Sequence, residues 1–186
     1  ISACLVGSEM CIRDRYCTEW KERTHPIPTS ERLKILYVGS LSDRKNVVEM
    51  FQVLCQKVEL ELGIVGDGEK RAQIEEMNIQ SKTEVTLYGI QPMERVSEIM
   101  QQYDVLILPS KHDGWGAVVN EALTVGLYVI TSNHCGASYL LKNKQQGMIF
   151  TLEEAQGLGN VVDACIAKKD WIRETCLLYT SPSPRD

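Results

Sequence analysis

Two carboxylates flank a Gly-Trp-Gly turn in the segment KHDGWGAVVNEALTVG, which covers residues 111–126. Asp113 and Glu121 are its acids, and the segment follows directly on the apolar run VLILP. In open α/β sheets, a strand that ends in such a turn and opens into a helix is where ligands bind. We therefore expect both acids to border one cavity, with backbone amides near Ala117 and Val118 available to a phosphate. An acid that only complements a helix dipole is the alternative for Glu121.

Two adjacent cations stand before a predicted helix in the segment GSLSDRKNVVE. Arg44 and Lys45 lie near the positive end of that helix dipole, which disfavours cations unless an anion lies between them. A bound phosphate would supply the anion, whereas two solvated surface cations would need none. Asn46 and Glu49 form a capping-box pattern, which predicts that the helix begins at about Val47.

Glycines mark two further strand ends. Gly66 and Gly68 follow the apolar run LELGIV, and Gly89 follows VTLY. Glycine at such positions permits either a tight turn or a close approach of the backbone to a ligand. The spacing does not match the three-glycine dinucleotide fingerprint, so plain strand-to-helix turns remain the alternative.

Short apolar runs rich in β-branched residues alternate with amphipathic stretches of helical length. Strands are predicted at 34–38, 60–65, 84–89, 105–110, 128–133 and 147–150, and helices at 46–57, 69–80, 93–102, 117–126, near 138–143 and from about 152. Continuous apolar strands, each separated by a helix, imply a parallel sheet covered on both faces. The predicted fold class is therefore α/β, a Rossmann-like parallel sheet with helices on both faces.

The two ends of the chain look foreign to this fold. With suitable codons, the segment LVGSEMCIRD near the start encodes on its opposite strand LLYTSPSPR, which stands near the end. Both ends resemble one sequencing-adaptor oligonucleotide translated from opposite strands, and such segments are excluded from fold arguments. We expect residues 1–15 and 176–186 to be artefacts, 16–33 to be a linker remnant, and 34–175 to form the Rossmann-like domain.

Composition excludes several functional classes. The net charge of -5 gives no broad basic surface for nucleic acid. Cys17, Cys55, Cys135 and Cys165 show no Cys-x-x-Cys spacing, so reduced thiols in a cytosolic protein are expected, with no metal site or disulfide framework. No apolar run of about 18 residues is present, so no transmembrane segment is predicted.

The ordered set VGSLSDRKN, GIVGDGE and LPSKHDGWGAVVNEAL resembles the C-terminal, donor-binding domain of family 4 of the retaining glycosyltransferases, the glycosyl transferases group 1. The resemblance covers about residues 33–150. It implies one half of a GT-B architecture, in which two Rossmann-like domains face each other across a cleft. The other half, which precedes it and binds the acceptor, is expected to be missing here.

By that resemblance, Glu121 accepts hydrogen bonds from the donor ribose hydroxyls, a task suited to a carboxylate. Arg44 and Lys45 would neutralise the diphosphate leaving group, and Asp113 would hold the transferred sugar. The other donor-binding positions that it implies are Gly39, Ser40, Gly66, Gly68, Gly89, Ile90, Gly116, Ala117 and Val118.

Three positions depart from the family's pattern. Asp113 stands where a Glu is usual, so its carboxylate reaches less far by one methylene. Ser40 stands where many members carry Arg, which leaves the phosphate contacts to Arg44 and Lys45. Tyr139 occupies a place often held by Glu.

The implied reaction is metal-independent transfer of a hexose, with retention, from a nucleotide-diphosphate sugar to a glycan or lipid-linked acceptor. The sequence has no Asp-x-Asp pair of the kind that holds a divalent ion under a diphosphate, and no cofactor is expected.

Bacterial surface-polysaccharide or lipopolysaccharide synthesis is the process suggested by the resemblance. The full-length enzyme would be cytoplasmic, peripheral at the inner face of the membrane, and this fragment alone would not turn over because transfer needs both substrates oriented together. A GT-B phosphorylase or epimerase and a non-catalytic Rossmann-like binding domain are the alternatives.

Overall fold

A six-stranded parallel sheet forms the centre of the computed structural model, which describes residues 30–113, 117–141 and 143–180, with side chains to residue 176. The strand order is β3-β2-β1-β4-β5-β6, and every pairing is parallel. The strands are β1 Leu33–Val38, β2 Leu60–Val65, β3 Glu84–Gly89, β4 Val105–Leu108, β5 Tyr128–Ser132 and β6 Gly147–Phe150. This sheet confirms the predicted fold class.

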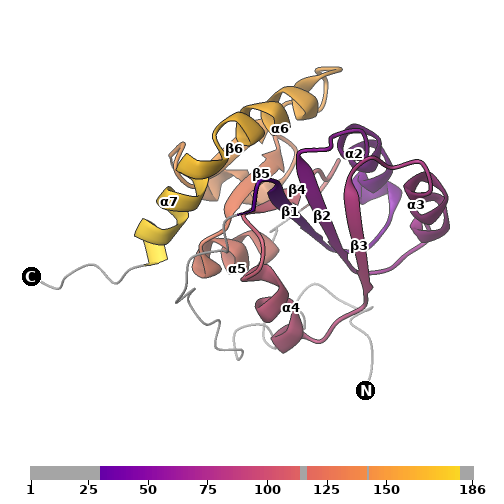
Figure 1. The fold of residues 1–186 in the computed structure, drawn as a ribbon, viewed down its shortest axis with the longest axis horizontal. Helices are drawn as coiled ribbons and strands as arrows, with labels where there is room; N and C mark the ends of the chain where they lie inside the picture. Colours follow the sequence, from indigo (N-terminus) through magenta and orange to yellow (C-terminus); the bar gives the residue numbers. More distant parts are fainter. Residues whose placement is uncertain (1–29, 114–116, 142, 181–186) are drawn as a thin grey trace, which may run out of the picture.

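Helices cover both faces of the sheet (Figure 1). The helices are α2 Val47–Leu54, α3 Arg71–Asn78, α4 Met93–Met100, α5 Ala117–Val125, α6 Gly157–Ala167 and α7 Lys169–Thr180, with short 3-10 turns η1 Asp43–Lys45 and η2 Gly136–Leu140. In Figure 1, α4 and α5 lie on one side of the sheet and α6 on the other.

Strand alternation produces two apolar cores, one on each face. In β1, Ile35 and Tyr37 join the core formed with α2, α3 and α6, whereas Leu36 joins the core formed with α4 and α5. Successive strand side chains point to opposite faces, so a strand in the middle of a two-faced sheet must be apolar throughout. β4 follows the same rule, with Ile107 in the first core and Leu106 in the second.

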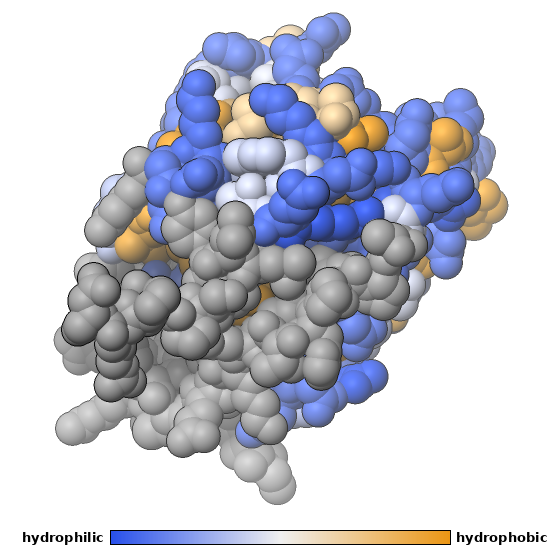
Figure 2. Space-filling model, turned by 60° about the vertical axis from the view of Figure 1, so that its left-hand side comes forward, coloured by the Kyte–Doolittle hydropathy of each residue, from blue (hydrophilic) through white to orange (hydrophobic). Residues whose placement is uncertain are grey.

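The outer surface is mainly polar. Figure 2 shows hydrophilic side chains over most of the described part of the face in view, with apolar side chains in separate patches between them. The described helices include none whose length and apolar content would let it cross a membrane.

The prediction of one last helix from about residue 152 is wrong, because the structure has a later start and two helices. The first of them, α6, begins at Gly157 instead of about residue 152, and it ends at Ala167, two residues before α7 begins. The segment before Gly157 is held elsewhere, since the Leu152 amide donates to Asn133 Oδ1 at 3.1 Å and Glu153 accepts from the Asn133 side chain. These contacts to the end of β5 compete with helix formation.

The predicted domain boundaries stay predictions. β1 begins at Leu33, inside the proposed linker remnant, and α7 runs to Thr180 across the proposed boundary at residue 175. Cys176, the first residue of the proposed tail, is buried against the core formed with α2 and α6.

A buried ion pair fixes α7 to the amino-terminal edge of the sheet. Arg173 Nη2 and Nε each lie 3.0 Å from a carboxylate oxygen of Asp104, and the side chains are 10% and 0% exposed. Arg173 also donates to the backbone oxygens of Ser30 and Arg32, each at 2.8 Å, and the Lys34 amide donates to Asp104. The hydrogen bond with Asp104 raises the pKa of the Arg173 guanidinium, so Arg173 stays charged.

Arg173→Met keeps the aliphatic stem but leaves the Asp104 carboxylate buried without its cation. We expect the free energy of unfolding to fall by about 3 kcal/mol or more, because a buried charge loses its partner. Urea denaturation followed by circular dichroism measures the change. The control is Arg95→Met, which breaks an exposed pair with Glu98 on α4 and should cost less than about 1 kcal/mol. Equal losses in both variants would contradict a structural role for the buried pair.

Candidate functional site

Three glycine loops meet at the carboxyl edge of the sheet, where β1, β2 and β3 end. The Gly39 amide donates to Val65 O at 3.0 Å, and the Gly66 amide donates to Gly89 O at 2.8 Å. A Cβ on Gly66 would lie 1.9 Å from Gly39 O, and its φ of 129° disfavours any side chain. The loops therefore pack backbone against backbone, so the close approach that these glycines permit is to a neighbouring loop.

The second loop is also tied to the first. The Leu41 amide donates to Asp67 O and the Lys70 amide to Leu41 O, each at 3.0 Å. Gly68 lies between them, and a Cβ there would lie 2.5 Å from Leu41 O. Both predicted glycines of this loop are thus required by close backbone contact.

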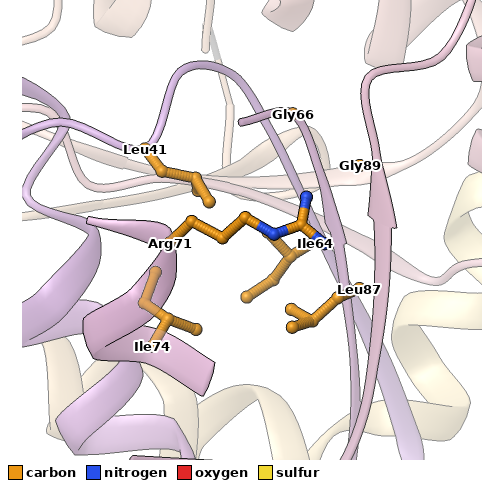
Figure 3. A pocket seen from close by; sticks show the side chains of 7 residues that line it. All are labelled: Leu41, Ile64, Gly66, Arg71, Ile74, Leu87 and Gly89. Atoms are coloured by element: carbon orange, nitrogen blue, oxygen red, sulfur yellow. The ribbon is translucent and has the colours of Figure 1, made fainter. Parts of the chain in front are cut away.

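Arg71 lies beside the glycine loops and was not predicted from the sequence. Its side chain extends from the start of α3 toward β2 and β3, where it ends close to Ile64 and Leu87 (Figure 3). A Cβ on Gly89 would lie 3.5 Å from Arg71 Nη1. Arg71 bonds Glu75 at 2.8 Å and Asp67 at 3.1 Å, and these acids raise the pKa of its guanidinium. The signal available in the sequence was a cation three residues after Gly68 at a helix start.

The predicted cations and the predicted acid lie together. Lys45 Nζ forms an ion pair with Asp113 Oδ2, and the two side chains are 13% and 14% exposed. Arg44 Nη1 donates to His112 O at 3.0 Å, and the Lys111 amide donates to Arg44 O at 2.9 Å. The turn after β1 and the turn after β4 are therefore joined by side-chain and backbone contacts.

Tyr37 lies beneath this junction. Its hydroxyl donates to Ser40 O at 2.8 Å. Burial raises the pKa of Tyr37 most, the Asp113 charge raises it further, and the Arg44 charge opposes them. The phenol therefore stays protonated and serves as a neutral donor to the turn after β1.

The predicted capping box is wrong, although the helix does begin at Val47. Asn46 has a left-handed backbone with φ 57°, and its side chain makes no capping bond. Within the described residues, its buried Oδ1 has no hydrogen-bond partner. Glu49 instead pairs with Lys111 at 2.9 Å. The left-handed backbone turns the Asn46 side chain away from the first amides of α2, and Glu49 contributes to the junction with the turn after β4.

The remaining predicted donor-binding residues are distributed along the same edge. Glu121 lies in α5 and is buried, as is Val118, whereas Ala117 is partly exposed at the helix start. Ile90 and Ser40 are exposed next to the glycine loops. Gly116 lies outside the described residues. That Asp113 and Glu121 border one cavity stays a prediction.

The loop after β5 closes against Asp113. The Gly136 amide donates to Asp113 O at 2.8 Å, and Asp113 forms an isolated bridge with Cys135. Tyr139 is exposed on η2. Among the described residues, no cluster of three or more histidine, cysteine or acidic side chains could hold a metal ion.

Residues 19–175 match the family described as Glycosyl transferases group 1. The amylovoran biosynthesis glycosyltransferase AmsK of Erwinia amylovora is 28% identical over 142 residues, which are 70% of this chain and 35% of that protein. The crystal structure of WaaG, a glycosyltransferase involved in lipopolysaccharide biosynthesis, has a TM-score of 0.67 at 24% identity, covering 84% of this chain and 44% of WaaG. Anabaena HepE in complex with UDP has a TM-score of 0.66 at 20% identity, and the match covers 81% of this chain and 44% of HepE. The chain thus spans about a third of AmsK, and these matches confirm the family resemblance.

Gly66→Ala tests the backbone packing of the loops. We expect the free energy of unfolding to fall by about 2 kcal/mol or more, because the methyl group overlaps Gly39 O and the φ is unfavourable. The matched control is Gly159→Ala in α6, where the added Cβ would lie 3.9 Å from Val53 and should stabilise by roughly 0.5–1 kcal/mol. Thermal and urea denaturation of both variants distinguishes the expected loss of stability in Gly66→Ala from the expected gain in Gly159→Ala. A neutral Gly66→Ala would contradict the described contact.

Glu153 should make the loop after β6 sensitive to acid. A hydrogen bond from its own backbone amide and then bonds from Asn133 and His134 hold the pKa of Glu153 below its usual value. Because the folded pKa is depressed, the stabilisation is present above the unfolded pKa and is lost as pH falls through the folded pKa. Between about pH 5 and pH 3, the native chain should therefore lose more stability than Glu153→Gln. The difference in acid sensitivity is measured from melting temperatures across this pH range, and Glu154→Gln is the control. Identical acid sensitivity in Glu153→Gln and the native chain would contradict the assignment.

Proposed function

The chain belongs to the glycosyl transferases group 1 family, and we propose that its carboxyl sheet edge binds the nucleotide-sugar donor of a retaining glycosyltransferase. The observation that carries this proposal is the junction of Arg44, Lys45 and Asp113. Two cations from the turn after β1 and one acid from the turn after β4 come together although the ion-paired residues are 68 positions apart. A diphosphate and an attached sugar need this combination of charges side by side.

The cations act on the leaving group. As the bond to the sugar breaks, negative charge develops on the diphosphate, and fixed cations stabilise that charge better than reorganising water does. Arg44 is exposed and its backbone is held by Lys111, so its position is set while its guanidinium remains accessible. Lys45 lies next to it and is more enclosed. The leaving phosphate would itself accept the proton of the acceptor hydroxyl.

Glu121 binds the ribose. The residue projects from the second turn of α5, and a carboxylate can accept two hydroxyl hydrogen bonds at once. α5 begins at Ala117, and the first backbone amides of a helix have no partner within the helix, so they can donate to phosphate oxygens.

The nucleoside lies against the glycine loops. Gly66 and Gly89 are partly exposed beside one another, and the exposed Ile90 offers an apolar surface to a base. HepE, which shares this fold, is described in complex with UDP. That similarity supports a nucleoside diphosphate as the ligand class for this chain.

The acceptor would be a glycan or a lipid-linked glycan, bound by a further domain of the full-length enzyme. AmsK is named for amylovoran biosynthesis and WaaG for lipopolysaccharide biosynthesis. These names support a hexose transfer in bacterial surface-polysaccharide or lipopolysaccharide assembly, carried out in the cytoplasm at the inner face of the membrane. The fragment would bind the donor without turning over.

Glu121→Gln tests the donor site. Calorimetric titration of the chain with UDP, GDP and ADP should show binding of one nucleotide, and the variant should weaken that binding by about tenfold or more. The amide keeps the shape of the side chain but loses charge-assisted acceptors, each worth about 1.5–3 kcal/mol.

The control for this titration is Glu98→Gln, an exposed acid on α4 whose change should leave nucleotide affinity unaltered. Circular dichroism checks that each variant is folded. Unchanged affinity in Glu121→Gln would remove the ribose role, and a folded native chain that binds none of the three nucleotides would remove the donor-site proposal.

A further inference from the structure

We propose that Asp113 distinguishes the nucleotide-sugar donor from the nucleoside-diphosphate product, because it acts as the counterion of Lys45 until a ligand replaces it. This inference rests on the proposed donor site and adds a selection step to it. Donor and product differ at the terminal phosphate, which carries a sugar in the donor and is free in the product.

The contacts of Asp113 show that Lys45 is already neutralised. Asp113 Oδ2 forms an ion pair with the Lys45 ammonium, and Ser110 Oγ lies 3.5 Å from the same oxygen. Both charged side chains are more than four-fifths enclosed, so water screens their attraction less than at an open surface. A phosphate that approaches Lys45 must therefore compete with the Asp113 carboxylate.

Asp43 and Glu49, the acids nearest in sequence to the two cations, are already paired with other cations. Asp43 is paired with Lys70 at 2.9 Å, and Glu49 is paired with Lys111 at 2.9 Å. Arg44 is turned to His112 O, a neutral acceptor. Among these side chains of the described residues, Arg44 is therefore the cation without an acid partner, because Asp113 is paired with Lys45.

Donor and product differ in what they offer to Asp113. The hydroxyl groups of a bound sugar can donate to the carboxylate and so replace the Lys45 contact. A free terminal phosphate loses its second proton near about pH 6, so above that pH the product places about one extra negative charge close to Asp113. The donor therefore satisfies both members of the ion pair, whereas the product satisfies Lys45 and repels Asp113.

Selection of this kind also favours release of the product. Once the sugar has left, the carboxylate has lost its hydroxyl donors and faces the new phosphate charge. Re-formation of the Lys45–Asp113 pair then displaces the diphosphate. The carboxylate is positioned for this, because it already lies within contact of Lys45.

Asp113→Asn tests the selection directly. The chain is titrated calorimetrically with UDP, UDP-glucose and inorganic pyrophosphate, which has free phosphate charge but no nucleoside or sugar. We expect the variant to bind UDP and pyrophosphate about tenfold more tightly, because one like charge is removed at short range. Its affinity for UDP-glucose should not rise, because the amide is a poorer acceptor for the sugar hydroxyls.

The matched control is Asp43→Asn, which makes the same charge change in the turn that carries Arg44 and Lys45. It should raise the ratio of UDP affinity to UDP-glucose affinity less than Asp113→Asn does, because Asp43 is paired with Lys70. If Asp113→Asn does not fold, Lys45→Gln provides the second test. That variant leaves Asp113 without its cation, so the ratio of UDP affinity to UDP-glucose affinity should fall instead of rise.

The outcomes separate this inference from the proposed donor site. Binding of UDP that depends on Glu121, with a UDP to UDP-glucose ratio unchanged in Asp113→Asn, would overturn the selection by Asp113 and leave the donor site intact. A change of that ratio in Asp43→Asn as large as in Asp113→Asn would overturn it as well. A folded native chain that binds neither pyrophosphate nor any of UDP, UDP-glucose, GDP and ADP would overturn both proposals.

Discussion

The parallel pairing of β1 with both β2 and β4 is the constraint on which the site depends. Ile35 is in register with Leu62 on one side and with Val105 on the other, so the three strands end at one edge. Parallel strands must be connected by crossovers, and these place turns from distant parts of the sequence next to each other. The turns after β1 and β4 can therefore share a single ion pair, and the glycine loops after β1, β2 and β3 can share backbone hydrogen bonds.

Charge balance at this edge differs from what the sequence suggests by itself. Arg44 and Lys45 stand before the positive end of a helix, where an anion is needed to offset an unfavourable dipole. Asp113 provides an anion for Lys45 in this structure. The need for an anion is thus real, but a protein carboxylate meets it as well as a phosphate would. In the donor site that we propose, a ligand enters by exchange of one anion for another.

Sequence predicted the strands and the glycine turns because both depend on local chemistry, namely apolar periodicity and the absence of a side chain. It also predicted the members of the cation and acid group. It did not predict the Lys45–Asp113 contact as a pair, the place of Arg71 or the segment before Gly157, since each depends on partners brought close only by the fold. The capping pattern at Asn46 failed for a related reason: a left-handed backbone at φ 57° overrode the preference of the side chain.

Two ion pairs at opposite edges of the sheet show why one is structural and the other suited to exchange. Asp104 lies at the amino edge, fully buried, and Arg173 bonds it together with two backbone oxygens. Every oxygen of that carboxylate already has a partner, so opening the pair would expose several unsatisfied groups at once. At the carboxyl edge, Lys45 and Asp113 retain partial exposure, and Arg44 beside them is open to solvent. Incoming phosphate and hydroxyl groups can replace each contact there one for one, so the pair can open without leaving a buried charge alone.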